Sequence, residues 1–336
     1  MRRWRYGIRV ISACLLLLAV GVMGVWHEAG QPVGGDAPIR VVIRPGSSLR
    51  QVGSQLQQAG VIRSQWAWDL RSRWQPWVVR AGTYDLDPRQ NLAGVMETLA
   101  SGQTVQVRIT IPEGWRIRQM DGYLREEIGI PDFERVAADF VPAPWIPKTA
   151  PSLEGFLFPE TYFLPIEDLS APALIRLMLQ QFQAQALPLW QAHTPPPDWD
   201  VLQWVTLASI VEKEAVLPQE RRLIAGVFWQ RLQRGMPLGA DPTIEYFLNI
   251  RQTPTRRLTF AEVRIPSPYN TYLNPGLPPG PIASPGLASL QAALDPEPTD
   301  YLYFVARYDG SHVFSRTLAE HEAAQRQIIR DQAAGS

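Results

Sequence analysis

Cysteine is almost absent from this 336-residue chain, and histidine is scarce. Cys14 stands alone, which excludes a disulfide framework and any zinc site built on a pair of cysteines. The histidines show none of the spacings that are typical of metal ligands; they are His27, His193, His312 and His321. The sequence therefore predicts no bound metal and no cofactor.

Charge of one sign is also lacking, since 32 Lys and Arg residues balance 32 Asp and Glu residues. A protein that binds nucleic acid generally carries a basic excess, so we expect no nucleic-acid partner. A neutral polymer such as a glycan suits this balance better. Hydrophobic residues make up 46% of the chain, enough for a membrane anchor and two domains with buried cores. The 12 tryptophans can stack on sugar rings, although tryptophan is also ordinary core material.

Long apolar runs are missing except at the N-terminus. Arginines among the first nine residues precede an uncharged run from Val10 to Trp26, at the short end of what spans a bilayer. Because positive charges stay on the cytoplasmic side, residues 1–26 predict a single-pass anchor. The resulting expectation is a protein of the inner membrane whose C-terminal domain lies in the periplasm.

Two other interpretations of the N-terminus remain open. Ala19–Gly21 could serve as the cleavage site of a signal peptide, but the apolar run continues to Trp26, which favours an uncleaved anchor. A lipoprotein would need the long apolar stretch before Cys14, whereas most of it follows that residue. Cys14 is therefore interpreted as a thiol buried in the membrane.

A small α+β module is predicted at residues 39–104, after a linker at 27–38. Gly60 and Gly102 end two of its helices, and Ser47 or Ser48 can cap the first. The apolar spacing predicts strands at 39–43 and 82–86 and helices at 49–59, 65–73 and 92–99.

The remainder predicts a connecting α+β region at 105–200 and a catalytic α+β domain at 201–336. The apolar segment Leu153–Pro159 is expected to pack against the last domain. A buried strand is expected at 302–305. Further expected elements are a strand at 105–111 and helices at 116–127, 173–186, 199–216, 218–234 and 318–329.

One helix of the last domain carries two glutamates within a broad apolar arc. Successive residues turn by about 100°, so Glu212 and Glu214 lie about 160° apart and should not share a pocket. Small residues, Ala208 and Ser209, leave room for a substrate beside Glu212. Apolar walls favour the protonated form of a carboxyl group, which a general acid requires.

A structural interpretation of both glutamates competes with catalysis. In that interpretation each carboxylate pairs with an arginine, such as Arg221 or Arg222, and buried carboxylates generally need such a partner. Downstream loops rich in Pro, Gly, Asn and Tyr are suited to the walls of a polar groove. Their Asn and Tyr side chains can bond sugar hydroxyls and amides, but each is also a normal turn residue.

The chain resembles the YceG-like (MltG) endolytic murein transglycosylases over about residues 39–330. The segments that carry this resemblance occur in the family's order: Leu153–Pro159, Ala208–Glu214, Asp241–Thr243, Tyr269–Tyr272, Gly276–Gly280, Tyr301–Val305, Gly310–Phe314 and Glu320–His321. In this family the first glutamate of the Glu-Lys-Glu segment is catalytic, which implies that Glu212 is the acid/base. Glu214 is then a structural or positioning residue. The candidates for substrate binding are Ser209, Glu154, Asp241, Thr243, Tyr269, Asn270 and Tyr272.

The resemblance also implies a fold and a reaction. The module at 39–104 is similar to the family's LysM-like subdomain. The implied enzyme is a lyase that cleaves the N-acetylmuramic acid to N-acetylglucosamine β-1,4 bond of nascent peptidoglycan strands, leaves 1,6-anhydro ends and terminates glycan elongation. The implied partners are glycan strands, the membrane and peptidoglycan synthases. The competing interpretation is a non-catalytic scaffold that binds peptidoglycan, in which Glu212 is a buried structural charge.

Overall fold

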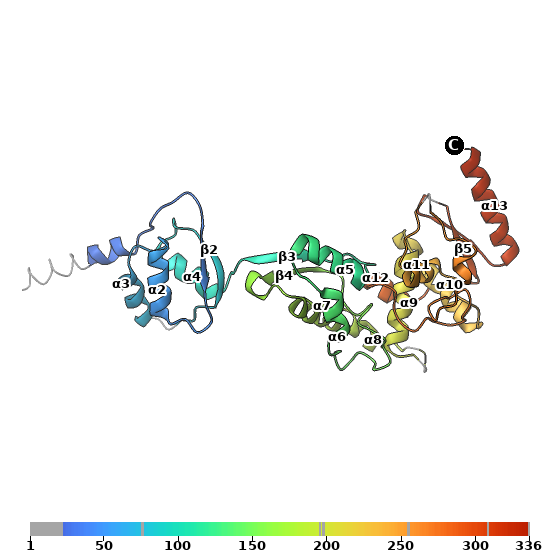
Figure 1. The fold of residues 1–336 in the computed structure, drawn as a ribbon, viewed down its shortest axis with the longest axis horizontal. Coiled ribbons are helices and arrows are strands. Elements are labelled where there is room, and N and C mark those ends of the chain that lie inside the picture. Colours follow the sequence, from blue (N-terminus) through green and yellow to red (C-terminus); the bar gives the residue numbers. More distant parts are fainter. Residues whose placement is uncertain are drawn as a thin grey trace, which may run out of the picture. The chain divides into compact units, whose positions relative to one another are not determined.

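The computed structural model describes residues 23–74, 77–194, 196, 199–253, 256–307 and 309–334. The chain forms two compact units. Unit 1 holds residues up to 107 together with 163–169, and unit 2 holds 108–162 together with 170–336. The predicted connecting region therefore lies mostly in the same unit as the predicted catalytic domain. Each unit combines helices with strands, which confirms the predicted α+β class (Figure 1).

Unit 1 is built on an antiparallel pair of strands, β1 (Ile39–Ile43) and β2 (Gly82–Leu86), with Val41 opposite Tyr84. Its other elements are the helices α2 (Leu49–Gln58), α3 (Gln65–Trp74) and α4 (Leu92–Ser101) and the short helix η2 (Ile166–Asp168). The predicted strands and helices of this module are all confirmed. Ser48 caps α2 through a reciprocal pair of bonds with Gln51.

The core of unit 1 is centred on Trp68. Its indole N–H donates to the carbonyl of Leu49 at 2.7 Å, which ties α3 to the start of α2. Gly53 in α2 faces the same ring, and a Cβ atom at that position would collide with it. The close approach of the two helices therefore depends on a glycine.

Unit 2 is mainly helical. Its helices are α5 (Ile117–Tyr123), α6 (Phe133–Asp139), α7 (Ala171–Gln185), α8 (Leu187–Ala192), α9 (Val201–Glu214), α10 (Arg221–Gln233), α11 (Asp241–Leu248), α12 (Leu287–Leu294) and α13 (Leu318–Ala334), with the short turns η1 (Leu124–Ile128), η3 (Pro218–Glu220) and η4 (Glu262–Arg264). The strands β5 (Tyr303–Ala306) and β6 (His312–Ser315) form an antiparallel pair. A further pair, β3 (Gln106–Thr110) and β4 (Thr161–Pro165), contains two of the three points at which the division into units falls.

The structure corrects one strand and adds elements that the sequence pattern did not predict. The strand expected to be buried at 302–305 is only half-buried, because β5 pairs with β6 alone in a two-stranded sheet. The predicted helix at 116–127 ends as an α-helix at Tyr123 and continues as a π-helical turn. Helices α6, α8, α11 and α12 and strands β4 and β6 were not predicted.

Helix α9 is the central helix of unit 2, and α12 packs along it (Figure 1). Asp200 caps its N-terminus by accepting from the backbone N–H groups of Leu202 and Gln203. The segment Leu153–Pro159 packs against this helix as expected, since Gly155 approaches both Val205 of α9 and Pro281. Buried aromatic residues of the same region, including Phe156 and Phe182, contact one another beside Trp204.

The predicted anchor at 1–26 lies almost wholly outside the described residues, which begin at 23. Residues 23–29 are helical, and Trp26 packs edge-on against Trp66 of α3. Across the part of the chain that the structure describes, no helix has both the length and the apolar character that crossing a bilayer requires.

Replacing Gly53 with alanine should destabilise unit 1. The added methyl group collides with Trp68, and overpacking a core typically costs about 1–3 kcal/mol. The matched control is Gly94→Ala in α4, where the new Cβ would have no neighbour closer than 3.5 Å. That change should stabilise the fold by about 0.5–1 kcal/mol, because alanine favours a helix. Chemical denaturation measures both, and equal effects of the two variants would contradict the packing described for Trp68.

Candidate functional site

Glu212 lies in the last turn of α9 and contacts the N-terminus of α12. Its Oε2 atom accepts hydrogen bonds from the backbone N–H of Gly286 at 3.1 Å and from the hydroxyl group of Ser289 at 2.6 Å. None of the described residues hydrogen-bonds its Oε1 atom. One oxygen of the carboxyl group is therefore fixed by α12, while the other remains able to form a further hydrogen bond. Two donors at a helix N-terminus also stabilise the ionised carboxylate that remains after a proton is given away.

The backbone segment before α12 runs along α9 and is attached to it twice. Ile282 donates its N–H to the hydroxyl group of Ser209 at 3.0 Å, and Gly286 donates to Glu212. Ser209 is fully buried and donates its own proton to the carbonyl of Thr206. The structure thus places this predicted substrate-binding residue inside the protein, where it holds the segment on the helix.

The turn between β3 and α5 approaches the same place from the other side. Gly114 donates to the carbonyl of Ser284, and Ser284 donates to the carbonyl of Trp115, both at 2.8 Å. The ammonium group of Lys213 donates to the carbonyl of Gly114 at 3.3 Å. Glu113 therefore sits on a turn that is fixed beside Glu212. Burial, followed by the nearby charge of Glu212, raises the pKa of Glu113 above its ordinary value.

Glu214 lies in different surroundings, as the helical spacing predicts. Burial raises its pKa to about 8, and the charge of Asp241 on α11 contributes to this shift. Asp241 accepts from the hydroxyl group of Tyr272 at 2.5 Å and from Gln252 at 3.0 Å. Three predicted site residues, Glu214, Asp241 and Tyr272, are therefore brought together, on a different side of α9 from the contacts of Glu212.

The arginine pairs of the structural interpretation are not formed. Arg222 instead pairs with Asp295, and no ion pair joins Arg221 to either glutamate in the described structure. Arg231 lies near Glu214 and lowers its pKa slightly against the effect of burial, but its guanidinium group donates to backbone carbonyls. The competing interpretation, in which Glu212 and Glu214 pair with arginines such as Arg221 or Arg222, is therefore not supported, because other groups surround both carboxyls.

Thr243 and Asn270 are buried and serve the backbone. Thr243 donates to the carbonyl of Ala240 and bonds the hydroxyl group of Thr271. The side-chain amide of Asn270 donates to two carbonyls and its oxygen accepts from the N–H of Tyr272. Both predicted substrate-binding residues thus shape the loops that carry Asp241 and Tyr272, and their side chains are closed to a substrate in this structure.

Glu154 and Tyr269 lie in a third group of residues. The carboxyl group of Glu154 is buried and accepts from the N–H of Ile117, and burial raises its pKa to about 8. It lines a pocket of about 370 Å³ together with Arg116 and Tyr246. Tyr269 contacts Tyr246, with ring centroids 4.9 Å apart. This pocket therefore places a predicted site residue, Glu154, on the wall of a cavity.

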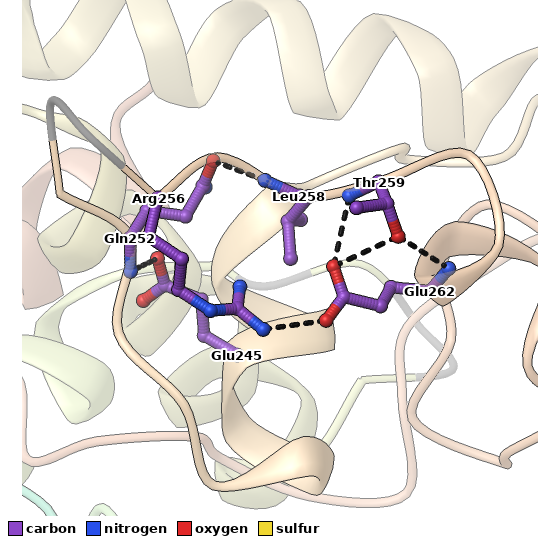
Figure 2. Close-up of polar contacts among 6 residues, drawn as sticks. All are labelled: Glu245, Gln252, Arg256, Leu258, Thr259 and Glu262. Carbon is purple, nitrogen blue, oxygen red and sulfur yellow. Dashed lines mark hydrogen bonds and ion pairs between the residues drawn. The ribbon is translucent and has the colours of Figure 1, made fainter.

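The loop between α11 and Tyr269 is fixed by its own polar contacts (Figure 2). Gln252 donates to Glu245 at 2.9 Å, and Leu258 donates to Gln252 at 3.1 Å. Glu262 accepts from Thr259 and Arg256, and these bonds hold its pKa below its ordinary value. The loop is thereby held on α11 without contributing a free carboxylate to the site.

No group of three His, Cys, Asp or Glu side chains suited to a metal ion is found within the described ranges. The chemistry that the described site supports is proton transfer by carboxyl groups. A carboxyl group with one oxygen left without a partner among the described residues, next to a second carboxyl, is a candidate for general acid catalysis.

The family described as YceG-like matches residues 41–327, which is most of the chain. This chain belongs to the YceG-like family. A relative from Bacillus subtilis (strain 168), named endolytic murein transglycosylase, is 33% identical over 319 residues, covering 89% of this chain and 88% of the relative. A relative of the same name from Streptococcus pneumoniae (strain ATCC BAA-255 / R6) is 29% identical, and the match covers 84% of this chain but 58% of the relative.

A solved structure supports the same membership. The crystal structure of a yceG-like protein from Listeria monocytogenes has a TM-score of 0.59 and 31% identity, covering 86% of this chain and 99% of that one. Several residues whose contacts are described above, including Glu212, Asp241 and Tyr272, lie in the segments that carry the resemblance to this family. Glu113 is the site residue that sequence reasoning missed. Its Pro-Glu-Gly sequence is typical of a turn, and nothing local in the sequence places it near Glu212.

The stability of this YceG-like protein should fall as the pH rises from about 5 to 8. Folded Glu154 keeps its proton up to a pKa of about 8, whereas the unfolded chain releases it in the ordinary range of glutamate. The unfolded state then binds fewer protons, so each such group lowers stability by up to about 1.4 kcal/mol per pH unit, and the loss is complete above pH 8. Glu214 adds to this dependence.

Thermal melting of Glu154→Gln across this pH range tests the assignment. The variant keeps an acceptor for Ile117 but cannot ionise, so its melting temperature should fall less steeply with pH than that of the native chain. The exposed Glu127→Gln variant is the control and should follow the native chain. Parallel curves for all three proteins would mean that Glu154 ionises normally in the folded state.

Proposed function

We propose that this protein is an endolytic murein transglycosylase with Glu212 as its catalytic acid/base. The observation that carries the proposal is the carboxyl group of Glu212, which has Oε2 fixed by Gly286 and Ser289 and Oε1 without a described partner. Membership of the YceG-like family and a relative of that name over most of both chains support the same activity.

The proposed reaction breaks a glycosidic bond without water. Protonated Glu212 gives its proton to the oxygen that links N-acetylmuramic acid to the leaving N-acetylglucosamine, and positive charge develops at the muramic anomeric carbon. The ionised carboxylate, stabilised by the donors on Oε2, then accepts the proton of that sugar's own C6 hydroxyl. Attack by this oxygen on the anomeric carbon closes a 1,6-anhydro ring. An ordinary glycosidase needs a second carboxyl for the corresponding proton transfer.

The competing function is a scaffold that binds glycan without cleaving it. A scaffold would require Glu212 to be a neutralised structural charge. The carboxyl makes no ion pair with the described residues and bonds only with one oxygen, which favours catalysis over a structural role. The apolar walls beside α9 suit a glycan in either case: Trp199 and Trp229 line a pocket of about 550 Å³ with Pro278.

The other parts of the chain suit action on nascent strands. We propose that unit 1 is a LysM-like module that binds peptidoglycan. Its strands β1 and β2 form an antiparallel pair, and the helices α2 and α3 lie between them in the chain. The apolar run up to Trp26 supports a single-pass anchor in the inner membrane with both units in the periplasm. Such an anchor would keep the enzyme near peptidoglycan synthases, where cleavage ends glycan elongation.

Glu212→Gln should abolish most of the activity while the protein stays folded. Glutamine keeps the bonds to Gly286 and Ser289 but cannot release and regain a proton, and general acid/base catalysis contributes about 10²–10⁴-fold. Formation of 1,6-anhydromuramyl ends from purified glycan strands measures the loss. Thermal melting of the same sample verifies the fold.

Glu214→Gln is the matched control on the same helix. With a pKa of about 8, Glu214 is mostly protonated at neutral pH, and glutamine is a close mimic of that form. We expect activity within about threefold of the native chain, far from the loss expected for general acid/base catalysis, and unchanged or higher stability above pH 8. A folded, fully active Glu212→Gln protein would overturn the proposed function. A stable but inactive Glu214→Gln protein would assign part of the chemistry to Glu214.

The anchor is tested separately by the mature N-terminus. The uncleaved anchor predicts a protein that begins at Met1 and stays in the membrane fraction after a high-salt wash. N-terminal sequencing that finds a start near Val22 would instead establish a cleaved signal peptide.

A further inference from the structure

Glu113 lies against the same backbone residue that bonds Glu212. A Cβ atom at Gly286 would lie 2.7 Å from Glu113 Oε2 and would collide with the rest of that carboxyl group. The N–H of Gly286 meanwhile donates to Glu212 Oε2 at 3.1 Å. Gly286 thus separates two carboxyl groups, and the absence of a side chain at this position is what allows Glu113 to lie there.

These contacts limit the distance between the two carboxyls. From the positions around Gly286 and standard bond lengths, Glu113 Oε2 and Glu212 Oε2 are no farther apart than roughly 8 Å. Paired carboxyls that flank a glycosidic bond in other enzymes are about 5–9.5 Å apart. Glu113 and Glu212 are therefore close enough to act on one bond.

The position of Glu113 is fixed although its side chain has no hydrogen bond to the described residues. Its turn is attached to the segment before α12 through Gly114 and Ser284, while the residue as a whole is exposed and its carboxyl group is partly buried. The charged groups that face it are Glu212 and Lys213 from α9 and Arg221 from α10. Lys213 donates to the adjoining backbone, and no ion pair joins Arg221 to Glu113 in the described structure. Neither cation therefore neutralises Glu113 directly.

Two neighbouring carboxyls without a neutralising partner are costly to a structure and frequent in active sites. We propose that Glu113 is a second catalytic carboxylate, which stays ionised beside the anomeric carbon and stabilises the positive charge that develops there. The inference rests on the proposed function, because it assigns Glu113 to the same reaction as Glu212.

The proposal leaves the proton transfers with Glu212. Its proton moves to the leaving oxygen, which keeps the electron pair of the broken bond. The C6 oxygen forms the new bond to the anomeric carbon and gives its proton back to Glu212. Glu113 gains and loses no proton in this cycle. Its fixed negative charge stabilises the sugar most when positive charge develops at the anomeric carbon. Such preorganised charge is typically worth about 10²–10³-fold in rate.

The test compares Glu113→Gln with Glu113→Asp in the full chain, using soluble uncrosslinked glycan strands. Glu113→Gln removes the charge and should lower kcat about 10²–10³-fold with little change in KM. Glu113→Asp keeps the charge and should recover part of that loss. In the native enzyme, activity should fall on the acidic side as Glu113 takes up a proton, above the ordinary pH range of a glutamate because its pKa is raised. This acidic limb should disappear in Glu113→Gln and persist in Glu113→Asp.

A steric variant checks the geometry without changing either carboxyl. Gly286→Ala keeps the N–H that bonds Glu212, and the φ of −75° at this position suits alanine, but its methyl group occupies the place of the Glu113 carboxyl. It should reduce kcat as Glu113→Gln does. Gly122→Ala, whose Cβ would meet nothing within 4 Å, is the control and should be fully active.

The outcomes separate the two proposals. If Glu212→Gln is inactive while Glu113→Gln keeps native kcat and the native acidic limb, Glu113 is not catalytic and the proposed function stands. If Glu113→Gln loses activity but keeps the acidic limb, the charge of Glu113 is not what the reaction needs, and this inference is overturned. An active Glu212→Gln enzyme rejects the proposed function itself.

Discussion

The contact between Glu212 and the first residues of α12 is the interaction on which the rest of the site depends. It joins the last turn of α9 to a helix more than 70 positions later through Gly286 and Ser289. The segment that leads into α12 is held along α9 by Ser209 and by the turn at 112–115. A displacement of α12 would therefore move the carboxyl group of Glu212, its donors and Glu113 together. Several buried polar groups of unit 2, such as Ser209, are accordingly hydrogen-bonded next to Glu212, whereas the Oε1 atom of Glu212 has no described partner.

The geometry of a single helix separates the two carboxyls of the Glu-Lys-Glu segment. Two residues apart on α9, Glu212 contacts α12, whereas Glu214 faces Asp241 on α11. Burial keeps Glu214 largely protonated near neutral pH, so it needs no arginine to neutralise it. Lys213, between them, bonds the backbone beside Glu113. Three consecutive side chains thus reach three different partners, and the first is the one proposed to act on a glycosidic bond.

The local pattern of the sequence predicted most of the fold and one side of the site. The spacing of apolar residues and the capping residues were enough to predict β1, α2, α4 and α9, because both are local properties of the sequence. The same spacing separated Glu212 from Glu214. Short elements such as α12 and β6 were missed because loops rich in Pro and Gly surround them and tertiary contacts decide their form. Glu113 was missed for the same reason, since its partner is about a hundred residues away along the chain.

The motif residues around Glu212 divide into groups that face a substrate and groups that hold the backbone. Ser209, Thr243 and Asn270 belong to the specific segments that relate this chain to its family, yet each is buried and bonded to main-chain atoms. A polar residue in such a motif is therefore weak evidence of contact with a ligand, because a rigid loop needs buried donors and acceptors of its own. Glu113 lies outside those segments, yet its carboxyl group is only partly buried, makes no hydrogen bond with the described residues and lies beside Gly286, which also bonds Glu212. By burial and bonding it is therefore freer to meet a ligand than Ser209, Thr243 or Asn270.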